Sequence, residues 1–147
     1  MTDQTLRKLS IITAIVGIVV SIYLTWSKIT HRPVICGGYG GCETVNSSSY
    51  ATIGNIPIAL LGVGAYATIL VLLLLENRSS FWREYSTMVV FGLALVGFLY
   101  SLFLTWVEIA VINAICPYCV VSAIAITLIF ILAIIRLVRG QGDPKTT

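Results

Sequence analysis

Four long apolar runs constrain the fold of this chain more than any other feature of its sequence. They cover about residues 9–28, 56–75, 87–111 and 115–138. A helix needs about 20 apolar residues to cross the hydrocarbon layer of a membrane. Every backbone polar group inside a bilayer must be satisfied within its own segment, so we expect each run to be a helix. The sequence therefore predicts an all-α membrane protein, a bundle of four transmembrane helices.

The composition excludes an ordinary soluble domain. Charged residues make up 10% of the chain and hydrophobic residues 58%, whereas a soluble domain carries about 25% charged residues. We expect one domain over residues 1–147, with an outer loop at about 29–55 as the main part outside the membrane. Within this loop, Glu43–Ile53 has apolar residues spaced as in a short amphipathic helix on the membrane surface.

The basic residues predict the orientation of the bundle. Seven of the nine lie before the first run, between the second and third, or at and beyond the end of the fourth: Arg7, Lys8, Arg78, Arg83, Arg136, Arg139 and Lys145. An excess of Lys and Arg marks the cytoplasmic side, so both termini should be cytoplasmic. The net charge of +3 then reports topology rather than nucleic-acid binding. The first run should be a retained span, because Thr25-Trp26-Ser27 is a poor signal-peptide cleavage site.

All four cysteines fall on the predicted outer side, where an oxidising compartment lets disulfides persist. Cys116 and Cys119 form a Cys-x-x-Cys unit at the start of the fourth run, after a short turn at about 110–115. Free backbone N–H groups at a helix start lower the pKa of the first thiol and make it reactive. Cys119, one turn further in, should face the apolar interior and meet a lipid-soluble electron acceptor.

The other two cysteines, Cys36 and Cys42, flank a glycine-rich stretch of the outer loop. Thiol–disulfide exchange can carry electrons between such a loop pair and a pair at the membrane boundary. Two other interpretations compete: both pairs could be structural disulfides, or the four thiolates could bind zinc. A Cys-x-x-Cys bridge closes too short a loop to stabilise a fold much, which favours a redox role over structural disulfides. The oxidising side and the absence of a second set of ligands nearby disfavour zinc, so we expect no metal.

Glu108 is an acidic residue within the third run, near its outer end. An ionisable residue at membrane depth is a candidate for function. At an interface it can instead extend its carboxylate toward water, and the sequence does not choose between the two.

The order of these features resembles the vitamin K epoxide reductase family, in its bacterial and archaeal branch. Three segments in this order carry the resemblance: Cys36 to Cys42 followed by Glu-Thr-Val-Asn-Ser-Ser, then Gly54-Asn-Ile-Pro-Ile-Ala-Leu-Leu-Gly62, then Cys116-Pro-Tyr-Cys119. The resemblance implies an enzyme that passes electrons from a separate thioredoxin-like protein to a membrane quinone, such as menaquinone or ubiquinone. The expected role is to support disulfide-bond formation.

The resemblance also implies a role for each matching residue. Cys36 would exchange with the partner, Cys42 would form the disulfide with Cys116, and Cys119 would lie beside the quinone and reduce it. Ser48 and Asn55 would lie near the quinone, with Asn55 hydrogen-bonded to one of its oxygens. The alternatives are a loop-turn role for Ser48 and a helix N-cap role for Asn55.

One departure from the animal members bears on the substrate. Those members carry a tyrosine one turn after the Cys-x-x-Cys unit, where this chain has Ala123. The departure puts vitamin K epoxide chemistry in doubt but leaves quinone reduction unaffected. An epoxide reductase, and a non-enzymatic membrane protein with structural disulfides, are the alternative functions.

Overall fold

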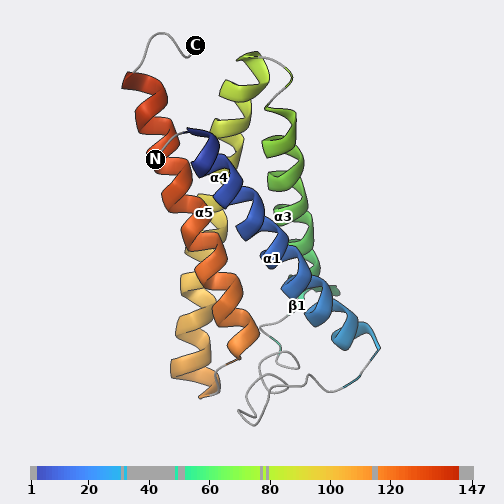
Figure 1. Cartoon of the computed structure of the whole chain (residues 1–147). Helices are drawn as coiled ribbons and strands as arrows, with labels where there is room; N and C mark the ends of the chain where they lie inside the picture. Colours follow the sequence, from blue (N-terminus) through green and yellow to red (C-terminus); the bar gives the residue numbers. More distant parts are fainter. Residues whose placement is uncertain are drawn as a thin grey trace.

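The computed structural model of the chain is a bundle of four long helices (Figure 1). They are α1 (Asp3–Ile29), α3 (Ile58–Leu75), α4 (Ser80–Val107) and α5 (Pro117–Gly142). A short hairpin of β1 (Thr52–Ile53) and β2 (Ile56–Pro57) precedes α3, and a π-helix, η2 (Glu108–Ile112), continues α4. The structure describes residues 3–30, 32, 49, 52–76, 78, 80–113 and 116–142.

Each of the four helices is long and apolar enough to cross a membrane, which confirms the predicted four-helix transmembrane bundle. The helices extend beyond the apolar runs: α1 begins at Asp3 and α4 at Ser80. Polar residues outside the hydrocarbon layer can continue a helix, so hydropathy alone sets these ends too far inward.

Two predictions about the connections need correction. The third helix does not give way to a turn near residue 110, because η2 carries it on to Ile112. The predicted surface helix over Glu43–Ile53 is wrong at its end, where Thr52–Ile53 pairs with Ile56–Pro57 as an antiparallel strand. Backbone pairing across the tight turn at Gly54, which has a φ of 60°, favours the hairpin there. The parts of that prediction over residues 43–48 and 50–51 lie outside the described residues.

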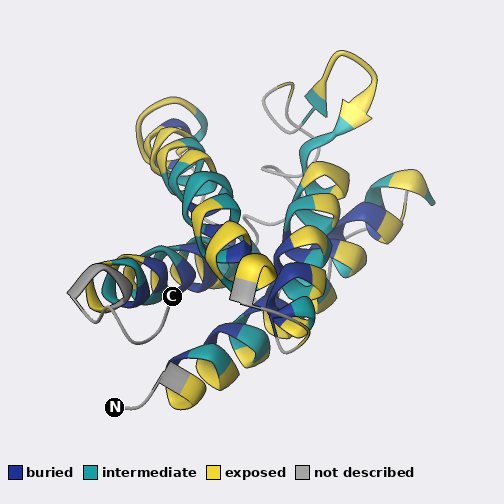
Figure 2. Ribbon diagram, turned by 90° about the horizontal axis from the view of Figure 1, so that it is seen from above, coloured by how far each residue is buried: buried dark blue, intermediate teal, exposed yellow. Residues whose placement is uncertain are grey.

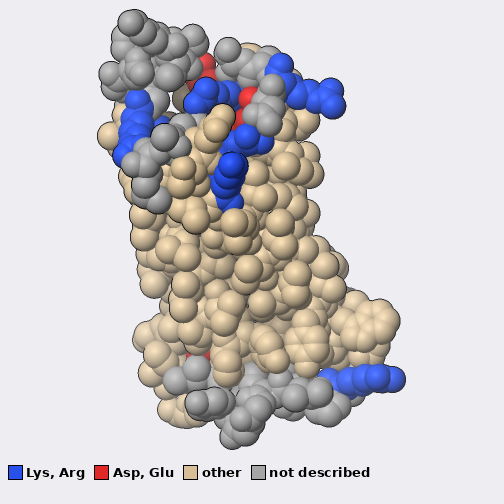
Figure 3. Space-filling view, viewed as in Figure 1, with Lys and Arg blue, Asp and Glu red and all other residues tan. Residues whose placement is uncertain are grey.

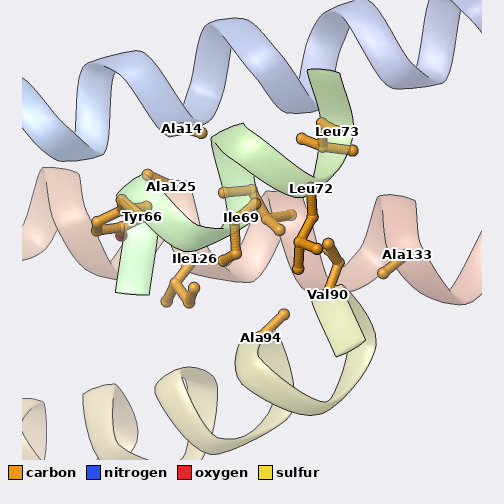
Figure 4. Close-up of a cluster of buried hydrophobic side chains, with 11 residues drawn as sticks. Ala14, Tyr66, Ile69, Leu72, Leu73, Val90, Ala94, Ala125, Ile126 and Ala133 are labelled. Atoms are coloured by element: carbon orange, nitrogen blue, oxygen red, sulfur yellow. The ribbon is translucent and has the colours of Figure 1, made fainter. Parts of the chain in front are cut away.

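The helices pack in a ring in which α1 contacts α3 and α5, and α4 contacts α5 and α3. The core lies between them, and α3 supplies much of it through Tyr66, Ile69, Leu72 and Leu73 (Figure 4). Gly17 of α1 allows a close approach to this core. A Cβ at that position would lie 2.5 Å from the ring of Tyr66.

Each helix carries buried residues on one side and exposed residues on the other (Figure 2). Many large apolar side chains lie on the outer faces, among them Val19, Val71 and Ile131. Surfaces this apolar suit contact with lipid tails rather than water. The protein is therefore an integral membrane protein.

Charged side chains separate the two ends of the bundle. Figure 3 shows Lys and Arg gathered at the end where α1 begins and α5 ends in Figure 1, beyond a broad belt without charge. We call this the basic end; its described basic residues are Arg7, Lys8, Arg78, Arg83, Arg136 and Arg139. The opposite end, which we call the cysteine end, holds Cys116 together with Lys28 and Arg32.

A buried ion pair ties the helices together at the basic end. Arg136 donates hydrogen bonds to both carboxylate oxygens of Glu76, at 3.0 Å to Oε1 and 2.6 Å to Oε2. Ser86 also donates to Oε1, at 3.2 Å, and Arg7 lies 3.8 Å from Oε2. The carboxylate of Glu76 thus joins α1, α4 and α5 to the end of α3.

Candidate active site

The site at the cysteine end is built on the first turn of α5. Cys116 immediately precedes the helix, and its carbonyl oxygen accepts the first bond of that turn from the N–H of Val120, at 3.1 Å. Pro117 is the first helical residue, where its fixed φ and missing N–H cost nothing. One turn of helix then brings Cys119 back beside Cys116. The Cys-x-x-Cys unit opens a helix, as the sequence predicts.

Both thiols of this unit are free, and their side chains are hydrogen-bonded to one another. The hydrogen bond from Cys119 lowers the pKa of the Cys116 thiol to about 7, with the backbone N–H groups of Cys119 and Tyr118 adding to the effect. Burial of Cys116 and the negative charge of Glu108 oppose this lowering. Cys116 therefore forms a thiolate near neutral pH, and the thiolate is the reactive species.

Glu108 lies against both cysteines. It is 5% exposed, its Oε2 accepts a hydrogen bond from the backbone N–H of Cys116 at 3.4 Å, and its side chain is hydrogen-bonded to that of Cys119. The carboxylate thus points inward, and the alternative in which it reaches out toward water is wrong.

The backbone at Glu108 changes from α-helix to π-helix. The segment ends at Asn113, which has a left-handed conformation with a φ of 56° and donates its backbone N–H to the carbonyl oxygen of Glu108. Single π-turns within helices are frequent at functional sites, because the wider turn changes the direction of the side chains. Here the π-turn accompanies the contact of Glu108 with the start of α5.

A cavity of about 390 Å³ adjoins the cysteines, between α1, α3, α4 and α5. Cys119 and Glu108 line it, whereas the fully buried Cys116 lies behind them in a small cluster with Leu24. Most of the wall is apolar, including Leu24, Ile58, Leu93 and Ile126. Its volume and chemistry match binding sites for small apolar molecules that carry a few polar groups.

Tyr66 and Ser122 form a second polar feature of the cavity wall. The hydroxyl of Tyr66 donates to the carbonyl oxygen of Ser122 at 2.9 Å and lies 3.1 Å from its hydroxyl oxygen. The aromatic rings of Tyr23 and Tyr118, whose centroids are 5.1 Å apart, pack α1 against the Cys-x-x-Cys unit. Tyr66 could not be recognised from the sequence, because a tyrosine in an apolar span gives no separate signal.

The structure brings together only part of the predicted site. Cys116 and Cys119 lie side by side, with Cys119 facing the cavity as expected. Cys36, Cys42 and Ser48 lie outside the described residues. Asn55 is exposed in the turn between β1 and β2 and does not line the cavity, although the nearby Ile53 does. The N-cap of α3 is Pro57, so the alternative that Asn55 caps this helix is wrong.

The sequence over residues 8–134 matches the family model described as the vitamin K epoxide reductase family. The chain belongs to the vitamin K epoxide reductase family. The match covers all of α3, α4 and η2 and most of α1 and α5, including the Cys-x-x-Cys unit. Membership makes the chain a membrane thiol oxidoreductase linked to a quinone or an epoxide.

The residues of the cavity fit a quinone of this family's kind. The apolar wall suits the ring and the start of an isoprenoid tail, and Cys119 offers sulfur at the same wall. A bound quinone would supply an acceptor for two electrons and two protons. Within the part of the chain that the structure describes, no group of three or more His, Cys, Asp or Glu side chains is arranged to hold a metal ion.

Proposed function

We propose that the protein is a quinone-linked thiol oxidase that supports disulfide-bond formation. Electrons would pass from a separate thioredoxin-like protein to Cys36 and Cys42, then to Cys116 and Cys119, and then to a membrane quinone. The cysteines would act on the extracytoplasmic side, with both termini in the cytoplasm. The basic end, where α1 begins and α5 ends, supports this orientation.

One observation carries the proposal. Cys119 lines an apolar cavity that lies among the transmembrane helices. The thiol of Cys116, which is hydrogen-bonded to Cys119, has a pKa lowered to about 7. A thiolate at Cys116 suits attack on a disulfide, since thiolates carry out the exchange. A thiol facing an apolar cavity suits electron transfer to a lipid-soluble acceptor. The two cysteines therefore have the different environments that a relay needs.

Ala123 supports a quinone rather than an epoxide as the substrate. It lines the cavity with a methyl group where the animal members of the family carry a tyrosine. A phenol at that position could donate a hydrogen bond to an epoxide oxygen, and alanine has no such donor. Quinone reduction does not depend on this donor.

The test is quinol formation by purified protein supplied with a reduced thioredoxin-like protein. Wild type should turn over, and Cys119→Ala should not. Cys36→Ala should lose turnover with the protein partner but keep it with dithiothreitol, which is small enough to reduce the inner pair directly. Full activity of Cys36→Ala with the protein partner would contradict the loop relay. Absence of quinol formation in wild type, with several quinones and partners, would favour structural disulfides.

A further inference from the structure

We propose that Glu108 is the proton carrier of the reaction: its carboxylate accepts the proton of the Cys119 thiol and delivers it to the quinone oxygen. The inference rests on the proposed function, because it requires a quinone in the cavity. It adds a catalytic residue that comes from η2 rather than from either cysteine pair.

The position of Glu108 supports this role. Its side chain is hydrogen-bonded to that of Cys119, which places a proton acceptor on the thiol that faces the cavity. Glu108 also lines the cavity, so the same carboxylate can reach a bound molecule. Among the described residues that line the cavity, it is the one carboxylate. A group that touches both the proton donor and the binding space can carry a proton between them.

The fold holds this carboxylate in place. The backbone N–H of Cys116 donates to Oε2 of Glu108, and the π-turn of η2 is closed by Asn113. Burying an acid at membrane depth is costly, so such residues usually mark a proton or ion pathway. Glu76, the other buried carboxylate of the described chain, contacts Arg136 and Arg7. Glu108 instead contacts the reactive cysteines, which favours a role for its carboxylate in their chemistry.

The proton and electron balance follows from the dithiol. Oxidation of the dithiol form of Cys116 and Cys119 to a disulfide breaks two S–H bonds, forms one S–S bond and releases two electrons and two protons. The quinone would take up both electrons and become the quinol. The proton of Cys119 moves to Glu108 as the sulfur gives up its electrons, and Glu108 then transfers it to the acceptor oxygen. The proton of Cys116 leaves to water, and the quinol takes its second proton from water. Glu108 ends the cycle in the state in which it began.

The variant Glu108→Gln separates proton transfer from structure. Glutamine keeps an oxygen that can accept the N–H of Cys116, but it cannot carry a proton at neutral pH. Glu84→Gln is the matched control, because Glu84 is an exposed residue on the same helix at the basic end. Glu108→Asp keeps a carboxylate and should restore part of the activity that glutamine loses.

Two measurements test this variant: it should make Cys116 react at lower pH, and it should slow the formation of quinol. The first is the rate of alkylation of Cys116 against pH in quinone-free protein, followed by mass spectrometry. The charge of Glu108 raises the pKa of Cys116, so Glu108→Gln should shift the midpoint to lower pH. Among the described residues, the cavity wall also holds Cys119, Tyr66 and Tyr100, and the Tyr23–Tyr118 pair packs at the Cys-x-x-Cys unit. The variant leaves these titratable groups in place.

The second measurement is quinol formation with dithiothreitol as reductant. The kcat should fall about 100-fold or more, while the KM for quinone should change less than about threefold. A larger thiolate fraction at Cys116 together with slower quinol formation is the result expected when a proton carrier is lost.

A kcat of Glu108→Gln within about threefold of wild type would overturn the inference. A fall in kcat equal in Glu108→Asp and Glu108→Gln, without a shift of the Cys116 midpoint, would also overturn it and assign Glu108 a structural role. Absence of quinol formation in wild type would instead refute the proposed function. The Glu84→Gln control should match wild type in both measurements.

Discussion

The buried ion pair between Glu76 and Arg136 allows a stability prediction worked directly from the geometry. Both side chains are less than 5% exposed, and the guanidinium of Arg136 makes two hydrogen bonds to the carboxylate, at 3.0 and 2.6 Å. Glu76→Gln removes the charge but keeps one oxygen acceptor. Arg136 is then a buried cation without its counter-charge.

We estimate the loss from the contacts that disappear. Removing one partner of a buried pair costs about 3–5 kcal/mol. One of the two hydrogen bonds to Arg136 can survive on the glutamine oxygen, so we expect the lower end, about 3 kcal/mol in the free energy of unfolding. The double variant Glu76→Gln/Arg136→Met removes both charges and should be more stable than Glu76→Gln alone.

The assay is equilibrium unfolding in mixed detergent micelles, followed by circular dichroism. Glu84→Gln removes an exposed carboxylate of α4 and should change stability by less than about 0.5 kcal/mol. A Glu76→Gln variant within about 1 kcal/mol of wild type would refute the argument, because it would mean that water compensates the cation.

Three further predictions test the packing and the site. Gly17→Ala places a methyl group 2.5 Å from the ring of Tyr66 and should cost about 1–3 kcal/mol by the same unfolding assay; Gly64→Ala, which meets nothing within 4 Å, should not destabilise the protein. Ala123→Tyr fills part of the cavity and should raise the KM for quinone about tenfold or more, measured by quinol formation; an unchanged KM would place the quinone elsewhere. The alkylation rate of Cys116 should rise with pH through a midpoint at about 7 and level off well above it, because its thiolate forms in that range; a midpoint near that of an ordinary thiol would contradict the lowered pKa.

The architecture follows from the sequence because hydropathy is a local property. Four apolar runs of sufficient length must form helices in a bilayer, and the structure confirms them. The Cys-x-x-Cys unit was equally readable, since Pro117 marks the start of a helix and one helical turn joins Cys116 to Cys119. The roles of Cys36, Cys42 and Ser48 stay predictions, because these residues lie outside the described part of the chain.

Contacts between distant segments could not be read from the sequence in the same way. Arg136 served there only as a marker of orientation, whereas the folded chain pairs it with Glu76, 60 residues away. Glu108 was ambiguous for the same reason, because one run of sequence does not show which neighbour an acidic side chain meets. The antiparallel packing of α4 against α5, together with the π-turn of η2, brings the carboxylate of Glu108 to the cysteines. Local composition thus fixes which segments cross the membrane, and the packing of those segments fixes which polar groups share its interior.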